Sequence, residues 1–398
     1  MQIEGRTTSL LDCYAEMQLI LCKDNAKIMF FVFFLYFSVI NPFPVMINSI
    51  CVLLQTFLLV LLYGIQNNIL MAQGKKLKSI KTGIYAAIAI IVIAAGALYG
   101  ASSYMLDYSL GYPKEERMTA EHWKERTRNE CPWTAAWMDS IYGNHCVKDT
   151  FLTMPSGYRA HAIYLYAPRA TVNTALVVHG YKVRAEGMLH IAYLYNHDLG
   201  YNVLLPDLYG HGLSEGDHIQ MGWLDRWDVI RWAEVANDIF RLSRSSSTRQ
   251  VIHGISMGAA TTMAVSGEKT PDYMERFVED CGYTSVWDEF AGQLKEEFGL
   301  PSFPLMNTTS WLCQQRYGWS FSEARQIEQV KKSTKPMLFI HGDKDAFVPY
   351  AMLRPLFDAK TKGRKAIFIA KDSVHAMAYR DHHKEYTARV KAFLNAAE

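Results

Sequence analysis

The sequence Gly-Ile-Ser-Met-Gly at residues 254–258 constrains the fold of this chain more than any other feature. It follows the apolar run 250–253 and opens a stretch suited to a helix. Gly254 and Gly258 suit a sharp, strained turn between a strand and a helix, where neighbouring backbone passes close. Such a turn lifts the hydroxyl of Ser256 above the sheet, near the N–H groups of the following helix.

Short apolar runs alternate with helical stretches from about residue 150 onward. The helical period is clearest at 223–242, where apolar residues recur every three or four positions. This alternation implies a mostly parallel sheet with helices on both faces, and sites in such sheets form at the carboxyl ends of the strands. We expect strands at residues 162–166, 175–178, 202–206, 250–254, 276–279, 337–340 and 366–369.

An acid and a histidine follow the last two expected strands. Asp345 belongs to the run His-Gly-Asp-Lys-Asp-Ala-Phe-Val-Pro at 341–349, and His375 follows the final strand. The chain order serine, acid, histidine is the one expected to accompany this kind of turn. We therefore expect His375 to take the proton of Ser256, and Asp345 to orient the imidazole and stabilise its charged form.

Four other residues offer alternatives for these roles. Asp343 is either the acid or a residue that caps a turn, and Asp280 is a second alternative because it follows another strand. His382 and His383 suit a solvated helix start better than a metal site. We expect Asp345 to be the acid and no metal to be required.

A second strand end carries His-Gly-Tyr at residues 179–181. A loop in this position supplies one donor of an oxyanion hole. We expect the backbone N–H of Tyr181 to join that of Met257 in holding the negative oxygen of a tetrahedral intermediate. The alternative is that these residues make only a tight turn.

Residues 282–329 separate two strands by more than a single crossover needs. The apolar residues there fit either a short helical lid over Ser256, which suggests an apolar acyl chain or side chain in the substrate, or an ordinary core. We expect Tyr283, Trp287 and Phe290 to line the pocket. The segment's apolar members are Trp287, Phe290, Phe298, Leu300, Phe303, Leu305, Met306, Trp311 and Leu312.

The N-terminal hundred residues are too apolar for a soluble domain. Residues 28–74 contain no charged residue and no histidine, and within them 45–65 is long enough to cross a bilayer. A second uncharged run, 82–106, is the stronger candidate for a span, with a buried soluble helix as the alternative. Four lysines precede it and favour a cytoplasmic start, which places the rest of the chain outside the cytoplasm. They are Lys75, Lys76, Lys78 and Lys81.

A complete signal-anchor is indicated by Met71 followed by the lysines and the second apolar run. We therefore expect the functional chain to begin at Met71. Cleavage near 97–102, where small residues cluster, is the alternative. The expected domains are an apolar extension at 1–70, the basic flank and membrane anchor at 71–106, a helical stalk at 107–149, and a catalytic domain at 150–398 with its lid at about 282–329.

Four of the seven cysteines lie in the part expected outside the cytoplasm. An even number there permits two disulfides, Cys131–Cys146 and Cys281–Cys313 being the preferred pairing. Four free buried thiols are the alternative. None of the cysteines has the C-x-x-C spacing of a metal site.

The chain from about residue 150 to 397 resembles the α/β-hydrolase superfamily, and within it the serine aminopeptidase-like hydrolases and their membrane-anchored bacterial relatives. The resemblance rests on residues 179–181, 207–216, 254–258, 341–349 and His375. In that family the second aspartate of the H-G-x-x-D-x-x-V-P block is the acid, which here is Asp345. Asp207 and His211 resemble a structural loop. The resemblance implies an esterase, thioesterase or peptidase.

The function that we expect is that of a membrane-anchored serine hydrolase that cleaves a carboxylic ester through an acyl-enzyme. A peptidase, amidase or thioesterase of the same fold is the first alternative, and a non-catalytic membrane-anchored binding module is an alternative of another class. The net charge of +2 is too small to indicate a nucleic-acid partner. No metal or organic cofactor is expected, and the sequence leaves the oligomeric state open.

Overall fold

The computed structural model describes residues 75–396, with side chains from residue 83 onward. The apolar run 45–65 and the expected start at Met71 lie outside the described residues. The chain divides into two compact units, Met1–Ala97 and Leu98–Glu398, which are described separately below. The expected domain boundaries at residues 70, 106 and 149 stay predictions.

The described part of the first unit belongs to a long helix, α4 (Lys75–Leu110). Its stretch Gly83–Leu110 is long enough to cross a membrane and contains an 18-residue window with a mean hydropathy of 2.2. The large apolar side chains between residues 84 and 93, among them Ile90 and Ile91, are exposed. This stretch includes most of the second apolar run that the sequence indicates.

The second unit contains an eight-stranded sheet in the order β1-β2-β4-β3-β5-β6-β7-β8. Strand β2 runs antiparallel to β1 and β4, and the remaining neighbours are parallel. All seven expected strands are present, and the α/β-hydrolase fold is confirmed. Their bounds are β2 (Arg159–Leu165), β3 (Asn173–Val178), β4 (Asn202–Asp207), β5 (Arg249–Ile255), β6 (Met274–Asp280), β7 (Met337–Gly342) and β8 (Lys365–Ala370).

Strand β1 (Lys148–Thr153) was not expected from the sequence. It lies at the sheet edge, and none of its side chains is fully buried. It lacks the continuous apolar run of a strand that is covered on both faces, because its residues are only exposed or half-buried.

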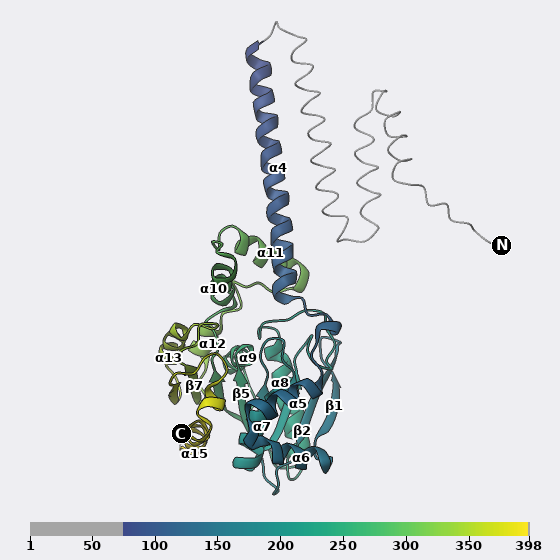
Figure 1. The fold of residues 1–398 in the computed structure, drawn as a ribbon, viewed down its shortest axis with the longest axis vertical. Coiled ribbons are helices and arrows are strands. Elements are labelled where there is room, and N and C mark those ends of the chain that lie inside the picture. Colours follow the sequence, from purple (N-terminus) through teal and green to yellow (C-terminus); the bar gives the residue numbers. More distant parts are fainter. Residues whose placement is uncertain (1–74, 397–398) are drawn as a thin grey trace, which may run out of the picture. The chain divides into compact units, whose positions relative to one another are not determined.

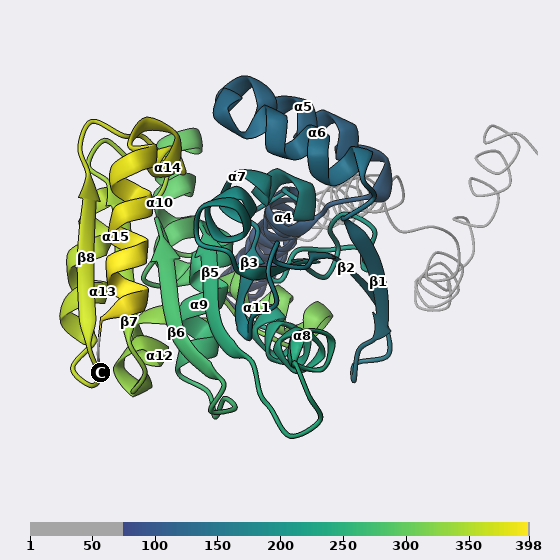
Figure 2. The ribbon, with the colours of Figure 1, turned by 90° about the horizontal axis from the view of Figure 1, so that it is seen from below.

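Helices cover both faces of the sheet (Figure 2). The helices fall into two groups, and the side chains of each group belong to a separate buried cluster. The first group is α8 (Asp225–Phe240), α9 (Met257–Ser266), α12 (Gln326–Lys332) and α13 (Leu353–Ala359), and the second is α6 (Ala135–Gly143), α7 (Leu189–Tyr193), α14 (Ala378–Asp381) and α15 (His383–Asn395). A further helix, α5 (Ala120–Glu130), precedes α6.

The connection from β6 to β7 carries two additional helices, α10 (Val286–Phe298) and α11 (Leu305–Tyr317), which Figure 1 shows beyond the end of the sheet. The hydroxyl of Ser285 accepts a hydrogen bond from the N–H of Asp288 and begins α10. Gly299, with φ of 66°, ends it in the left-handed conformation that glycine permits. These helices occupy the segment where a lid is expected.

The preferred disulfide pairing is wrong, because all four cysteines of the described part of the chain are free. Cys281 packs in one core cluster and Cys313 in the other, so the sheet separates them. Cys131 is buried after α5, whereas Cys146 is exposed just before β1.

Candidate active site

The turn between β5 and α9 has the strained geometry that its glycines predict. Ser256 has φ of 59° and ψ of −119°, a conformation that costs a non-glycine residue free energy. A methyl group on Gly254 would overlap the carbonyl oxygen of Gly258, and one on Gly258 would overlap that of Val178. Both positions therefore require glycine, and the turn directs the Ser256 side chain beyond the carboxyl end of β5.

Ser256, His375 and Asp345 form a continuous hydrogen-bonded chain. The Ser256 hydroxyl lies 2.8 Å from Nε2 of His375, and Nδ1 of that ring lies 2.7 Å from Oδ2 of Asp345. The carboxylate accepts at Oδ2, so Nδ1 carries the proton and Nε2 is free to accept from the serine. This is the relative placement of a nucleophile, a base and an orienting acid.

The structure places Asp345, and neither of its alternatives, against His375. Asp280 instead accepts a hydrogen bond of 2.8 Å from the hydroxyl of Tyr386. Asp343 accepts one of 2.6 Å from the N–H of Asp372, which fits the turn-capping alternative.

Asp345 is held as a carboxylate by its neighbours. Its Oδ1 accepts hydrogen bonds of 3.0 Å from the backbone N–H groups of Phe347 and Val348. Burial by itself would raise the pKa of Asp345, but hydrogen bonds from His341 and His375 outweigh it and lower the pKa below its ordinary value. The acid is therefore ionised at neutral pH and able to stabilise a charged His375.

The two expected oxyanion donors, the backbone N–H groups of Tyr181 and Met257, belong to residues that line the same cavity as Ser256. Neither N–H donates a hydrogen bond to any residue that the structure describes. Met257 begins α9, so its N–H has no partner within the helix. Both groups are thus available to a developing negative charge.

Two histidines, His179 and His211, hold the backbone around Tyr181 in place through hydrogen bonds. From the sequence, both were expected only in a turn or a structural loop. Nε2 of His211 accepts a hydrogen bond of 3.3 Å from the N–H of Lys182. Nδ1 of His179 donates to the carbonyl of Gly180 at 2.8 Å, and its Nε2 accepts from Leu208 at 2.9 Å. Burial lowers the pKa of His179 and of His211, which keeps both rings neutral.

Asp207 has the structural role that its loop position indicates. It is fully buried, and its carboxylate accepts hydrogen bonds from His161 at 2.7 Å and from the N–H groups of Ala185 and Leu213 at 2.8 Å. These contacts tie β2 and two loops together at the carboxyl end of β4, at a distance from the Ser256 hydrogen-bond chain.

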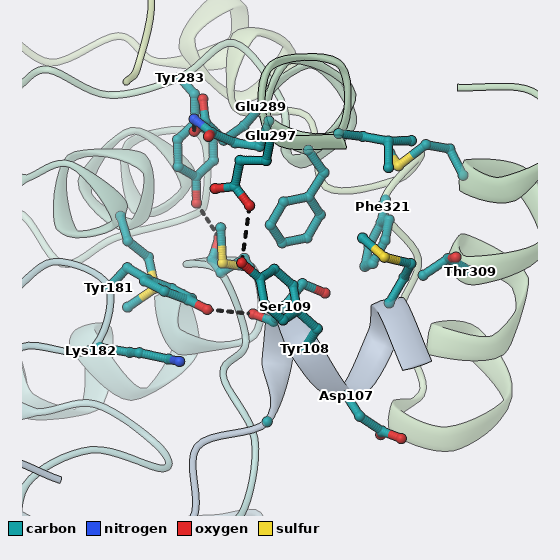
Figure 3. A pocket seen from close by; sticks show the side chains of 18 of the residues that line it. Asp107, Tyr108, Ser109, Tyr181, Lys182, Tyr283, Glu289, Glu297, Thr309 and Phe321 are labelled. Atoms are coloured by element: carbon teal, nitrogen blue, oxygen red, sulfur yellow. Dashed lines mark hydrogen bonds between the residues drawn. The ribbon is translucent and has the colours of Figure 1, made fainter. Parts of the chain in front are cut away.

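Ser256 opens into a cavity of about 690 Å³ with mostly apolar walls (Figure 3). Tyr283 and Phe290 line it as expected, but the prediction for Trp287 is wrong. Trp287 faces a separate hollow together with Trp311, because it lies on another face of α10.

The apolar residues of the segment 282–329 serve partly as a lid over Ser256 and partly as ordinary core, which were the two alternatives. Phe290, Phe298, Leu305 and Met306 line the cavity, whereas Leu312 is buried in the core. A third group is exposed and consists of Leu300, Phe303 and Trp311.

Several residues of the cavity wall were not expected from the sequence. Met105, Tyr108 and Ser109, from the last turns of α4, line it, although the sequence indicated only an anchor and a stalk there. Buried Glu289 also lines it, and burial raises the pKa of this carboxyl to about 7. The one feature of the sequence that could have indicated this role is that Glu289 lies four residues after Ser285, on the inner face of a capped helix.

The histidines at the start of α15 have structural partners. Nε2 of His382 lies 2.7 Å from the carbonyl oxygen of Lys371, and the ring of His383 stacks on Trp133 with centroids 4.5 Å apart. Within the described residues, one group has potential metal-ligand geometry, and it consists of Cys281, Asp345 and His375. Two of these already hydrogen-bond each other, and burial raises the pKa of the Cys281 thiol well above its ordinary value, which disfavours metal binding.

The sheet, the strained turn and the hydrogen-bonded serine define a serine hydrolase of the α/β-hydrolase fold. The chain belongs to the prolyl oligopeptidase family, whose model matches residues 189–397. The match covers the turn of Ser256 and the segments of Asp345 and His375.

Two bacterial proteins and one solved structure are similar to the chain. The chain is 30% identical over 253 residues to the uncharacterized protein YqkD of Bacillus subtilis, which covers 63% of this chain and 80% of that protein. It is 26% identical over 212 residues to YitV of the same organism, a protein provisionally named an esterase, covering 47% of this chain and 74% of YitV. The Pyrococcus furiosus esterase Pf2001 shares the fold, with a TM-score of 0.51 and 20% identity over 62% of this chain and 90% of that one.

Proposed function

We propose that this protein is a membrane-anchored hydrolase that cleaves carboxylic esters, with Ser256 as nucleophile, His375 as general base and Asp345 as the orienting acid. The observation that carries the proposal is the hydrogen-bonded chain from Ser256 to Asp345 at the edge of a largely apolar cavity. A non-catalytic binding module would have no need for a strained serine in contact with an imidazole that an acid orients.

The proposed reaction has two halves. Ser256 attacks the carbonyl carbon while His375 takes its proton, and the N–H groups of Tyr181 and Met257 hold the oxyanion. The protonated His375 then gives its proton to the departing alcohol, which leaves an acyl-enzyme. Water activated by His375 releases the carboxylic acid and restores the serine.

An ester is the preferred substrate class because an alkoxide leaves with less help from the general acid than an amine does. Peptide cleavage is the second candidate, and the family match favours it. The two are separated by comparing a p-nitrophenyl ester and a p-nitroanilide that carry the same acyl group, with the purified full-length chain. We expect the ester to have the higher kcat/KM. A higher value for the anilide would contradict the ester assignment and favour a peptidase.

We further propose that α4 anchors the protein with the second unit on the non-cytoplasmic side. Length and hydropathy support a span, and the lysines at residues 75–81 support the orientation. This line of support is independent of the chemistry at Ser256.

The exposed thiol of Cys146 tests the orientation. On intact cells, a membrane-impermeant maleimide is expected to label the full-length chain at Cys146, whereas the buried Cys131, Cys281 and Cys313 stay unlabelled. The Cys146→Ser variant is the control that assigns the label. Labelling of Cys146 only after the cells are broken would place the catalytic unit in the cytoplasm.

A further inference from the structure

The last turns of α4 are built into the wall of the Ser256 cavity. The backbone carbonyl of Ser109 accepts a hydrogen bond of 2.8 Å from the Tyr181 hydroxyl, beside the proposed oxyanion hole. Asp107 forms an ion pair of 3.0 Å with Arg316 of α11, and Arg316 also donates to the Ser103 hydroxyl at 2.6 Å. The end of the apolar helix is therefore attached to both the catalytic loop and the lid, as Figure 3 shows for Ser109 and Tyr181.

Exposed aromatic and apolar side chains lie where α4 meets the lid. We call the following set the rim patch, and its members are Tyr104, Tyr108, Phe298, Leu300 and Phe303. The rings of Tyr104 and Tyr108 stack with centroids 6.2 Å apart, and Tyr108 meets the edge of Phe298 at 5.6 Å. Phe303 follows in the connection to α11 and is 75% exposed. A group of exposed apolar side chains of this kind marks an interaction site.

Chain connectivity indicates what covers the rim patch. A helical span needs about 20 residues, so a span that begins at Gly83 ends near residue 102. Tyr104 and Tyr108 follow within two turns, where tyrosine and tryptophan concentrate at the boundary between lipid and water. A bilayer that holds α4 therefore has its surface near the rim patch.

The charges of the cavity restrict the headgroup of a ligand. Four carboxyl groups line the cavity, against one ammonium group, that of Lys182. Asp107 is paired with Arg316, and burial raises the pKa of Glu289 to about 7, so the repulsion of an anionic headgroup comes chiefly from Glu116 and Glu297. Such a lining favours an uncharged headgroup. The carboxyl groups belong to Asp107, Glu116, Glu289 and Glu297.

We propose that the substrate is an uncharged long-chain acyl ester that resides in the bilayer and reaches Ser256 across the rim patch. This proposal rests on the ester hydrolase function proposed above. The apolar wall formed by Phe290, Leu294 and Met306 receives the acyl chain. Hydrolysis consumes one water, releases the alcohol and the fatty acid, and returns Ser256 unchanged.

The test uses the full-length chain reconstituted in phosphatidylcholine vesicles that contain 1-oleoylglycerol. A soluble ester, p-nitrophenyl butyrate, is measured on the same vesicles. Phe303→Asp and Leu300→Asp each place a charge in the rim patch without touching the cavity, and Leu242→Asp is the matched control at a residue 60% exposed elsewhere. We expect both rim variants to lose roughly tenfold in oleoylglycerol hydrolysis, because an aspartate is costly at a lipid surface. Hydrolysis of the soluble ester should stay within about twofold in all three variants.

Several results would overturn this proposal. An unchanged rate of oleoylglycerol hydrolysis in both rim variants, or an equal loss with both substrates, would show that the rim patch is no route for lipid. Turnover of p-nitrophenyl butyrate alone by the parent protein would exclude a bilayer-resident acyl ester. Faster hydrolysis of a lysophosphatidylglycerol than of oleoylglycerol would contradict the uncharged headgroup. If the parent hydrolyses no ester at all, the ester hydrolase function itself is wrong.

Discussion

Replacing Ser256 by alanine is expected to lower kcat/KM for a p-nitrophenyl ester by roughly 10⁵-fold or more, since the nucleophile of the acyl-enzyme is lost. The Ser256 hydroxyl makes the 2.8 Å contact with His375, and no other hydroxyl of the described chain occupies that position. Ester hydrolysis by the purified variant, measured beside the parent, checks this result.

Ser266→Ala is the control for the first prediction. Ser266 ends α9 and donates a hydrogen bond of 2.8 Å to the carbonyl of Met263, on the same helix but away from the cavity. This variant should keep its activity within a few-fold, because it loses only a local hydrogen bond. An alanine at residue 256 that hydrolyses the ester at the parental rate would disprove the role of Ser256.

The second large effect is expected from Asp345→Asn, which should lower kcat by roughly 10⁴-fold while the fold is kept. An amide at this position can donate to Nδ1 of His375, which favours the tautomer whose Nε2 carries the proton and cannot accept the Ser256 hydrogen. The pH-independent plateau of kcat and the thermal unfolding temperature are the two readouts.

Asp343→Asn is the matched control for Asp345, since it changes the same atoms two residues away. The amide oxygen at residue 343 still accepts the hydrogen bond from the N–H of Asp372. Its activity should stay within about threefold of the parent. A similar loss in the two variants would mean that Asp345 acts through the stability of the loop and has no specific role toward His375.

The sequence predicted those parts of the fold and the site whose signals are local. Ser256, Asp345 and His375 each follow an apolar strand, and parallel strands bring their carboxyl ends to the same edge of a sheet. Seven strands were predicted because each contains a short apolar run, and this holds even for β8 at the opposite edge of the sheet. Strand β1 lacked that signal because polar residues interrupt its sequence and none of its side chains is fully buried.

The features that the sequence could not predict depend on contacts between distant residues. Tyr108 donates a hydrogen bond of 3.0 Å to Glu297, which lies 189 residues further along the chain. Nothing local to residue 108 distinguishes a stalk from a cavity wall. The prediction that Trp287 lines the cavity failed for a related reason. The sequence indicated where the lid lies, but it did not indicate which face of α10 turns toward the cavity. The even number of cysteines suggested disulfides, but their number says nothing about their positions in space. Cys281 and Cys313 lie in core clusters on opposite faces of the sheet and cannot pair.

The most direct test of the central claim is to treat the full-length chain with a fluorophosphonate and locate the adduct by peptide mass spectrometry. This reagent phosphonylates a serine that a neighbouring histidine has activated. The account predicts a single modified residue, Ser256, with no adduct in the His375→Ala variant. An adduct elsewhere, or an unmodified Ser256 in a folded protein, would contradict the assignment of this chain as a serine hydrolase that acts through Ser256.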